Sequence, residues 1–331
     1  MRLLVTGSAG FIGSAFVRML LGKSSPQKAS QYEISETVDK VVSLDILSYA
    51  ASTDNLAPVE GDARHVFVKG DICDAELVGS LVDQYKVDTI VNFAAESHVD
   101  RSIISSHEFA RSNVLGTCSL LDVALKRHCR FAQVSTDEVY GTLGDSGSFV
   151  ETMPLEPNSP YSASKAAADC FVRSYFETHK LPCLITRCSN NYGPYQFPEK
   201  FLPLTITNLI RGKKIPVYGT GQNVRDWLHV EDHCWGIYLA LAKSPWSADV
   251  YNLGGFGEVA NIDMAKKLIK ALGKDESSIE FVEDRKGHDW RYSMDSNKAQ
   301  RELAWKPMWK LDEGLAHMVD WYKSNQQWWD S

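Results

Sequence analysis

The sequence predicts an α/β protein in which a doubly wound parallel sheet is joined to a smaller, mixed α/β domain. Three observations predict this class. Short apolar runs alternate with helical patterns of about ten to fifteen residues, which is typical of βαβ units and a parallel sheet. A glycine-rich loop follows the first apolar run. Beyond about residue 186, prolines and aromatic residues become denser and the regular alternation stops.

The main sheet is expected to contain strands at residues 2–6, 41–45, 65–71, 89–95 and 131–136. Helical spacing of apolar residues predicts helices from the glycine loop to Leu21 and over residues 75–85, 113–127 and 161–178. The strands are apolar almost throughout, which indicates burial on both faces. Residues 23–39 are polar and aperiodic, so we expect a loop insertion there.

The expected division is a first domain over residues 1–185 and a second, smaller domain over residues 186–331. Short strands of the second domain are expected in KIPVYG (214–219) and VYNLGG (250–255). WLHVEDHCWGIYLALAK (227–243) has the pattern of a helix that returns to the main sheet. We therefore expect the segment near 227–250 to belong to the first domain.

Composition excludes several classes of protein. The 331 residues carry a net charge of −7 and no run rich in Lys and Arg, which argues against a nucleic-acid partner. No apolar stretch approaches the roughly 18 residues that span a bilayer, and the N-terminus lacks the features of a signal peptide. The seven cysteines form no CxxC pair, which favours reduced thiols in the cytoplasm and no metal site.

The loop Gly7-Ser-Ala-Gly10-Phe-Ile-Gly13 lies between the first strand and the first helix. Glycines in this context allow a tight turn and close approach to a pyrophosphate at the helix N-terminus. Asp45 ends the second strand, where a carboxylate accepts hydrogen bonds from an adenosine ribose. Residues 46–53 contain no Arg or Lys, which favours NAD over NADP. The alternatives are a plain tight turn and a solvated acid at the end of a strand.

Asp71 and Ile72, after the third strand, are expected to border the adenine of such a cofactor. Tyr161 and Lys165 are four residues apart in a segment that favours a helix, so both side chains lie on one face. An ammonium close to the phenol lowers the pKa of the tyrosine and makes it a general base, and the same lysine can hold the nicotinamide ribose. The spacing alone also occurs by chance.

The glycine loop, Asp45, Tyr161 and Lys165 together resemble the extended short-chain dehydrogenase/reductase family. This resemblance implies a Rossmann domain for NAD(P), a C-terminal domain for a nucleotide-sugar, and an active-site hydroxyl at Thr136. It also implies further cofactor contacts at Phe11, Ile12, Ser48, Phe93, Ala94, Ala95, Ser97, Ser112 and Asn191.

Asp137 and Glu138 follow Thr136 in the stretch STDEVYG, where a buried strand ends. Adjacent carboxylates repel each other and are costly to desolvate, and neither is needed for hydride transfer alone. Elimination of water from a sugar does need both an acid and a base, and neighbouring carboxyl groups readily split their pKa values. In an extended strand the two side chains point to opposite faces, so reaching one sugar requires that the backbone leave the strand, or that C5 and C6 of the sugar span the difference. The alternative is that both acids merely solvate a loop.

The stretches STDEVYG, FAAESHVDRS (93–102), PNSPYSASK (157–165) and RCSNNYGPYQFPEK (187–200) closely resemble the dTDP-glucose 4,6-dehydratases. The resemblance implies conversion of dTDP-glucose to dTDP-4-keto-6-deoxyglucose and water. Tyr161 is then the base for the C4 hydroxyl, Glu138 the base at C5 and Asp137 the acid at C6, with hydride returned to C6. Implied substrate contacts are Ser97, Thr136, Asn190, Lys200, Phe201, Pro216, Tyr218, Arg225, Asn261, Arg285 and His288.

The resemblance also implies a homodimer in which the helices over 113–127 and 161–178 form a four-helix bundle. Ile46, Ala51 and Trp290 depart from the pattern of this family. Two other activities remain open from the residues: a 4-epimerase or decarboxylase on the same scaffold, and a catalytically silent NAD-binding protein. The sequence does not separate dTDP from UDP, because one methyl group contributes only ~1 kcal/mol of pocket contact.

Overall fold

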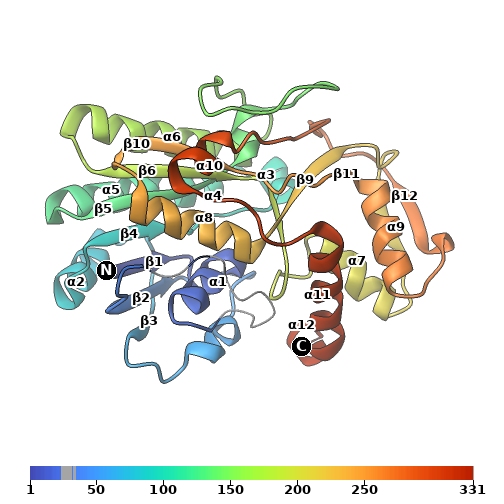
Figure 1. Ribbon diagram of the computed structural model, residues 1–331, viewed down its shortest axis with the longest axis horizontal. Coiled ribbons are helices and arrows are strands. Elements are labelled where there is room, and N and C mark those ends of the chain that lie inside the picture. The colour runs from blue at the N-terminus through green and yellow to red at the C-terminus, as the bar shows by residue number, and fades with distance from the viewer. Residues whose placement is uncertain (24–31, 33–34, 331) are drawn as a thin grey trace.

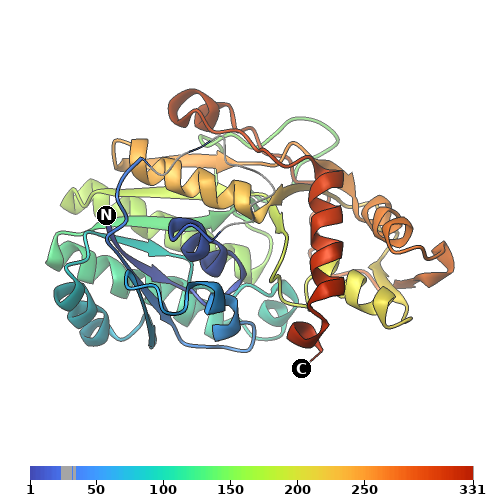
Figure 2. The ribbon, with the colours of Figure 1, turned by 60° about the horizontal axis from the view of Figure 1, so that its bottom comes forward.

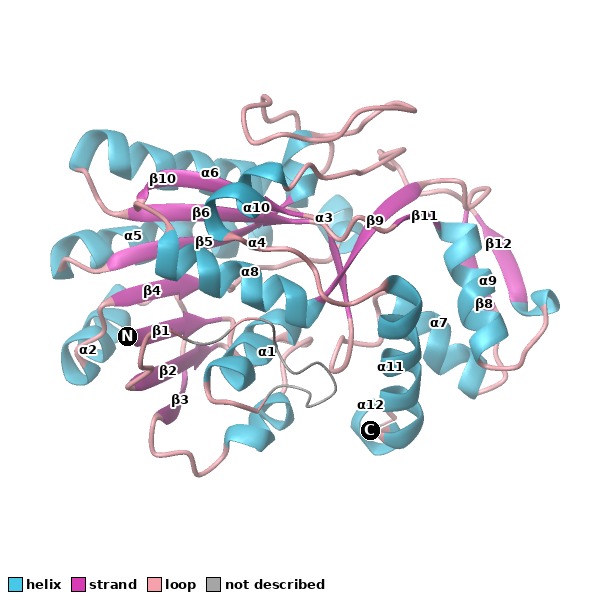
Figure 3. Cartoon of the chain, viewed as in Figure 1, coloured by secondary structure: helices cyan, strands magenta, loops and turns pink. Residues whose placement is uncertain are grey.

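The structure is a computed structural model that describes residues 1–23, 32 and 35–330. Its main sheet has seven strands in the order β10-β6-β5-β4-β1-β2-β3, and every neighbouring pair is parallel (Figures 1 and 3). The strands are β1 (Arg2–Thr6), β2 (Lys40–Asp45), β3 (His65–Lys69), β4 (Thr89–Asn92), β5 (Arg130–Thr136), β6 (Cys183–Cys188) and β10 (Ser247–Leu253). The predicted α/β class is confirmed. Most of the loop insertion predicted at 23–39 lies outside the described residues.

Helices cover both faces of this sheet (Figure 1). One face packs against α1 (Phe11–Leu20), α8 (Val230–Lys243) and α10 (Asn297–Leu303), and the other against α2 (Ala75–Tyr85), α5 (Gly116–Arg127) and α6 (Pro160–His179). In β1, Leu3 and Val5 belong to the first apolar core and Leu4 to the second. This alternation of two buried faces explains why the strands are apolar throughout.

The chain reverses its direction across the sheet between β1 and β4. From β1 it passes outward through β2 to β3, and it then returns to β4 on the other side of β1. Loops that leave the carboxyl ends of β1 and β4 therefore diverge, and the crevice between them is where open α/β sheets bind ligands.

The smaller part of the molecule contains two short sheets and three longer helices. Its sheets are β11-β9-β7 and β12-β8, with β7 (Asn190–Tyr192), β8 (Ile215–Tyr218), β9 (Val224–His229), β11 (Glu258–Ala260) and β12 (Ile279–Val282). Its helices are α7 (Phe201–Ile210), α9 (Asn261–Ala271) and α11 (Leu311–Ser324), followed by the short α12 (Gln326–Trp329). Figure 2 shows α7, α9 and α11 gathered beyond one end of the main strands, where they share an apolar core.

Several predicted boundaries are wrong. The strands expected over 65–71 and 89–95 end at Lys69 and Asn92, so the residues that follow lie in loops. The helix expected over 227–243 begins at Val230, because residues 227–229 belong to β9. The strand expected at 250–255 is part of β10 and pairs with β6 in the main sheet, although the prediction assigned it to the smaller domain. β9 and α8 are both buried nearly all round, so hydrophobic periodicity does not mark the boundary between them.

The helix predicted over 113–127 has an irregular start. Residues Ala110–Leu115 form a π-helical segment that leads into α5, preceded by the short α3 (Val99–Ile104) and α4 (His107–Phe109). Short 3-10 segments occupy Thr53–Val59, Asp137–Tyr140 and Glu276–Ser278. Among the described helices, none is both long enough and apolar enough to cross a membrane.

Candidate active site

A cavity of about 540 Å³ opens at the carboxyl ends of the main strands. Its walls come from the glycine loop after β1, the loops after β2, β3 and β4, the π-helical segment, and residues 188–200. The cavity thus lies where the reversal of strand order predicts a ligand, and it reaches from the sheet to the smaller part of the molecule.

The cavity brings together residues that are far apart in the sequence. All five predicted catalytic residues line it: Thr136, Asp137, Glu138, Tyr161 and Lys165. Every predicted cofactor contact also lines it: Gly7, Gly10, Phe11, Ile12, Gly13, Asp45, Ser48, Asp71, Ile72, Phe93, Ala94, Ala95, Ser97, Ser112, Tyr161, Lys165 and Asn191.

The glycine loop leaves no room for a side chain at Gly7 or Gly13. Gly7 has a φ of +61°, and a Cβ on it would lie 2.6 Å from the backbone nitrogen of Ala94. A Cβ on Gly13 would lie 2.2 Å from the carbonyl oxygen of Gly7. Gly10 caps α1 and has no side chain to accept hydrogen bonds from the first-turn amides. The N–H groups and the positive end of the helix dipole therefore remain available to an anion such as a pyrophosphate.

Asp45 and Asp71 lie beside this loop at the ends of neighbouring strands. The Asp45 carboxylate accepts hydrogen bonds from the amides of Ala9 at 2.9 Å and Leu47 at 2.8 Å, which fixes its orientation and leaves further lone pairs. Asp71 accepts a hydrogen bond from Arg111 at 2.5 Å. Between the two acids, residues 46–51 contribute no basic side chain to the cavity wall.

Helix α6 holds Tyr161 and Lys165 in its first two turns. Ser159 and Ser162 form a capping box, and Pro160 occupies the first turn, so the helix start is firmly set. Lys165 Nζ donates to the carbonyl oxygen of Val134 at 2.7 Å. The prediction that Tyr161 has a lowered pKa is wrong for this structure. Burial raises the pKa of Tyr161, and the nearby carboxylate of Glu138 raises it further.

The backbone leaves strand β5 at Thr136 and enters a 3-10 turn over Asp137–Tyr140, which we call the acid turn. The Thr136 hydroxyl donates to Asp137 Oδ1 at 3.2 Å and accepts from the amide of Glu138 at 3.3 Å. Asp137 is only 2% exposed, and its Oδ2 has no hydrogen-bond partner among the described residues. In an extended strand, the two acids would point to opposite faces. Because the backbone turns here, Asp137 and Glu138 both line the cavity and can face one sugar.

The two carboxyl groups have different electrostatic surroundings. Burial raises the pKa of Asp137 well above its ordinary value, the charges of Glu138 and Asp226 raise it further, and Arg225 acts to lower it. Burial and Asp289 also raise the pKa of Glu138, but three cations act to lower it, namely Arg225, Lys200 and Arg285. Asp137 is therefore held protonated more strongly than Glu138, which separates an acid from a base.

The predicted substrate contacts divide into two groups. Ser97, Thr136, Asn190 and Lys200 line the cavity, and Lys200 Nζ donates to the carbonyl oxygen of Ser97 at 2.9 Å. The cavity wall formed by the described residues does not include Phe201, Pro216, Tyr218, Arg225, Asn261, Arg285 and His288.

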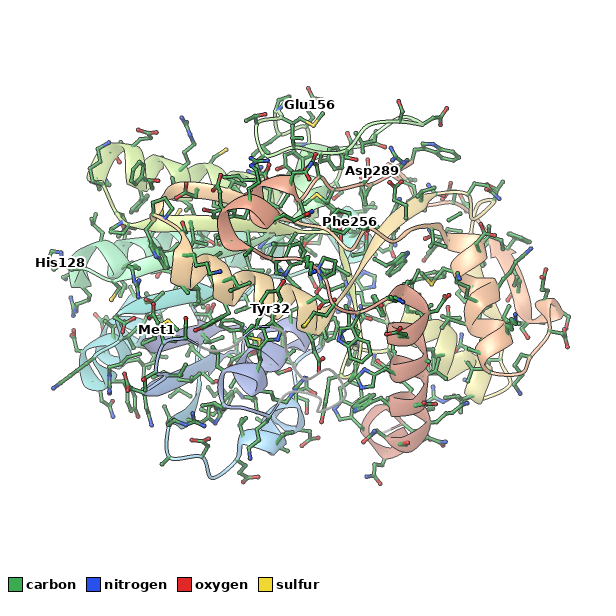
Figure 4. All side chains as sticks on the ribbon, in the orientation of Figure 1. Met1, Tyr32, His128, Glu156, Phe256 and Asp289 are labelled. Carbon is green, nitrogen blue, oxygen red and sulfur yellow. The ribbon has the colours of Figure 1, made fainter. Side chains whose placement is uncertain are left out.

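Part of the second group gathers beside the acid turn. The Arg285 guanidinium lies 5.2 Å from the Tyr218 ring centre, and that ring is 6.4 Å from the His288 ring. Arg285 also donates to both oxygens of Asp100, at 2.5 Å and 2.9 Å, so its fork is already engaged. Arg225 donates to the carbonyl oxygen of Asp289, which is labelled in Figure 4. The Asp289 carboxylate accepts a hydrogen bond from Asn158 in the loop before α6, so Asp289 connects that loop with the smaller part of the molecule.

Sequence reasoning missed several residues of the site. Arg111 and Glu199 line the cavity, and Glu199 accepts a hydrogen bond from the Tyr49 hydroxyl at 2.8 Å. Burial raises the pKa of Asp226 to about 6, so this acid is charged at pH 7 and acts on Asp137. Glu199 precedes Lys200 and Asp226 follows Arg225, so proximity to a predicted contact was the only signal available. No cluster of His, Cys, Asp or Glu within the described ranges is arranged to hold a metal ion.

Comparisons with known proteins agree on one family. The family profile described as GDP-mannose 4,6 dehydratase matches residues 4–318. A dTDP-glucose 4,6-dehydratase of an Actinoplanes species is 48% identical over 99% of this chain and 100% of its own length. The crystal structure of the dTDP-glucose 4,6-dehydratase DesIV from Streptomyces venezuelae, with NAD bound, has a TM-score of 0.94 at 51% identity, covering 100% of this chain and 99% of that one.

More distant structures share the fold with a different activity. A UDP-glucose 4-epimerase from Thermotoga maritima has a TM-score of 0.87 at 26% identity, covering 98% of this chain and 100% of that one. The fold alone therefore does not distinguish a dehydratase from an epimerase.

Proposed function

This chain belongs to the extended short-chain dehydrogenase/reductase family, and from that premise we propose that it is an NAD-dependent dTDP-glucose 4,6-dehydratase. The reaction converts dTDP-glucose to dTDP-4-keto-6-deoxyglucose and water. The observation that carries this proposal is the acid turn, which brings two adjacent carboxyl groups to the cavity. The pKa of Asp137 is raised well above its ordinary value, whereas three nearby cations counteract the rise at Glu138. Neither oxidation nor epimerisation at C4 needs that pair.

The glycine loop, Asp45 and the loops after β3 and β4 fit NAD. Gly7 and Gly13 have no room for a Cβ, the first amides of α1 have no side-chain cap, and the described cavity wall after β2 lacks a basic partner for a ribose phosphate. We assign Asp45 to the adenosine ribose, the segment around Asp71 to the adenine, and Lys165 to the nicotinamide ribose. NAD supplies the redox chemistry when bound, because it accepts hydride from C4 and returns it to C6.

Oxidation at C4 requires that the C4 hydroxyl lose a proton. We assign this proton to Tyr161, with the Thr136 hydroxyl as the second hydrogen-bonding group. Burial favours the neutral phenol of Tyr161. We assign to Lys165, from the next turn of α6, the role of favouring the phenolate when the site is filled.

Elimination follows because a ketone at C4 acidifies the proton on C5. Glu138, surrounded by Arg225, Lys200 and Arg285, is the ionised carboxylate that takes this proton. Asp137, protonated and with Oδ2 lacking a partner among the described residues, donates its proton to the departing C6 hydroxyl, which leaves as water. The C5 proton returns from Glu138 when hydride reaches C6. Tyr161 then holds one proton, taken from the C4 hydroxyl, and Asp137 lacks one, so transfer of that proton to Asp137 through solvent restores both groups.

The substrate nucleotide is assigned to the side of the cavity lined by Asn190 and Lys200, and beyond the cavity wall to the segments 216–225 and 285–288. Lys200, Arg225 and Arg285 supply cations for the diphosphate, with Asn190 and Ser97 closer to the sugar. Phe201, Pro216, Tyr218, Asn261 and His288 are assigned to the nucleoside. For Arg285 to reach the diphosphate, it must exchange at least part of its ion pair with Asp100.

The proposal is tested with dTDP-glucose deuterated at C4, using purified protein without added NAD and then with it. Loss of one water with deuterium transferred to C6 is the expected result. Unchanged mass with inversion at C4 indicates an epimerase instead. No reaction with either dTDP-glucose or UDP-glucose, with NAD added, indicates another substrate or a silent binding protein.

We also propose a homodimer through the outer face of α5 and α6. Leu115 at the start of α5 is 62% exposed and Phe171 on α6 is 40% exposed, which is unusual for large apolar side chains. Ile104 on α3, which packs beside α6, is 86% exposed. Light scattering is expected to give twice the mass of one chain, and Phe171→Glu to reduce it. A single-chain mass for the wild type contradicts the dimer.

A cytoplasmic location is proposed from the cysteine pattern, and cell fractionation tests it.

A further inference from the structure

A buried ion pair lies behind the acid turn, outside the cavity wall. Arg187 in β6 donates from Nε to Asp169 Oδ2 in α6 at 2.9 Å. The two residues are 5% and 2% exposed. Asp169 follows Lys165 by four residues and Tyr161 by eight, so the three side chains lie along one face of α6. The ion pair is thus built onto the helix that carries the Tyr–Lys pair.

The same arginine holds the last residue of the acid turn. Arg187 Nη1 donates to the Tyr140 hydroxyl at 2.8 Å, and its guanidinium lies 4.8 Å from the centre of that ring. The hydroxyl in turn donates to Asn252 Oδ1 in β10 at 2.8 Å, and Asn252 is itself fixed by the carbonyl oxygen of Phe149. The Tyr140 ring stacks on the Phe149 ring at 5.0 Å.

We infer that the Asp169–Arg187 pair is a positioning device, which through Tyr140 holds Asp137 and Glu138 in register with Tyr161 and Lys165. This inference rests on the proposed function. Oxidation at C4 depends on α6, whereas elimination depends on the acid turn, and both must act on one sugar ring. Misplacement of a catalytic group by about 1 Å can cost roughly 100-fold in rate, so the two elements need a rigid connection.

A role in stability alone does not account for this arrangement. A buried ion pair is often no more stabilising than well-packed apolar residues of the same volume. Asp169 Oδ1 moreover has no hydrogen-bond partner among the described residues, so the pair is not optimised for charge satisfaction. What the network does provide is a fixed distance from α6 through β6 to the acid turn and to β10.

The test is Tyr140→Phe, which removes only the hydroxyl between Arg187 and Asn252 and keeps the ring stacked on Phe149. Stopped-flow absorbance at the NADH band measures oxidation, and deuterium uptake from solvent at C5 measures elimination. Elimination is expected to slow roughly 10- to 100-fold while oxidation changes less than about twofold. NADH is therefore expected to accumulate on the enzyme during turnover.

Two further variants make the result specific. Tyr238→Phe is the matched control, because Tyr238 is buried in α8 and its hydroxyl bonds to Ser35 and Glu36 on another side of the fold. Both steps are expected to be unchanged in it. Arg187→Lys retains the charge opposite Asp169 but lacks the fork that reaches Tyr140, so it is expected to reproduce the selective slowing if Tyr140→Phe does not fold.

Three outcomes overturn the inference. Equal slowing of oxidation and elimination in a folded Tyr140→Phe indicates a general structural role. No slowing of either step indicates no role in positioning. Loss of elimination in the Tyr238→Phe control indicates that the assay responds to any buried hydroxyl. A wild-type enzyme that forms no NADH and loses no water refutes the proposed function itself, so that failure is separate from these three.

Discussion

The cofactor end and the substrate end of the cavity are built in different ways. The cofactor end is mostly backbone: glycines packed against Ala94 and against each other, and strand ends that the parallel sheet brings to one edge. At the end assigned to the substrate, Lys200 lines the cavity and Arg225 and Arg285 lie outside its wall, and these charged side chains come from segments far apart in the sequence. The turn of the glycine loop is made by residues close in sequence, although its neighbour Ala94 comes from another strand end, whereas the group of charges is assembled by tertiary packing alone.

The largest expected effect is a loss of activity at the substrate end, with NAD binding at the cofactor end unchanged. Glu138→Gln removes the base for C5 without changing the size of the side chain, and loss of a general base slows a reaction roughly 10²- to 10⁴-fold. The rate of water loss should fall by that factor, while bound NAD per chain stays unchanged. Loss of bound NAD in this variant would contradict the separation of the two ends.

Gly13→Ala is expected to weaken NAD binding at the cofactor end. The added Cβ would lie 2.2 Å from the Gly7 carbonyl oxygen, and overpacking of this kind costs about 1–3 kcal/mol, or roughly 10- to 100-fold in NAD affinity. Calorimetry with NAD measures the loss. Gly144→Ala is the control, since a Cβ at Gly144 meets no atom within 4 Å. Equal loss of affinity in both variants would show that the glycine loop is not special.

Arg285→Ala tests whether this arginine binds the substrate, lowers the pKa of Glu138, or does both. Loss of a charge-assisted hydrogen bond costs about 1.5–3 kcal/mol, so we expect KM for dTDP-glucose to rise roughly tenfold or more. Because Arg285 acts to lower the pKa of Glu138, the acidic limb of the kcat profile should also move to higher pH. An unchanged pH profile with a raised KM would mean that Arg285 binds substrate without tuning the base.

The smallest expected effect is on the free energy of unfolding and comes from the buried carboxyl group of Asp137. Because folding raises the pKa of Asp137, the unfolded chain releases this proton first as the pH rises past about 4, and the folded state loses stability from there up to the folded pKa. Asp137→Asn removes that penalty. The variant should be more stable than the wild type at pH 7 by about 0.5–2 kcal/mol, the usual gain from one stabilising substitution, while losing activity.

Urea unfolding at pH 7 and at pH 4 measures this difference. The gain in stability should be much smaller at pH 4, where Asp137 is protonated in the folded chain and about half protonated in the unfolded chain. A gain of the same size at both pH values would show that packing of the amide, rather than titration, is responsible.

The site residues that could be predicted from the sequence are those whose reactive groups lie close together along the chain. The glycine loop, Asp45, Tyr161 with Lys165, and the Thr136 triplet each lie within one turn or one strand end, and all line the cavity. Sequence reasoning was weakest where elements from the second half return to the first. β10 completes the main sheet beside β6, yet its short apolar run looks the same as a strand of the smaller sheets.

The α/β class, the cofactor loop and the triplet of reactive residues could be predicted from the sequence, because periodicity and motif spacing are local properties of the chain. The family resemblance proposes Asp137 as the acid, but the physical difference between the two adjacent carboxyl groups comes from the tertiary structure. Folding places Asp226 near Asp137, and Lys200 and Arg285 near Glu138, while Arg225 acts on both. Electrostatic interactions depend on distance through space, which residue order along the chain does not specify.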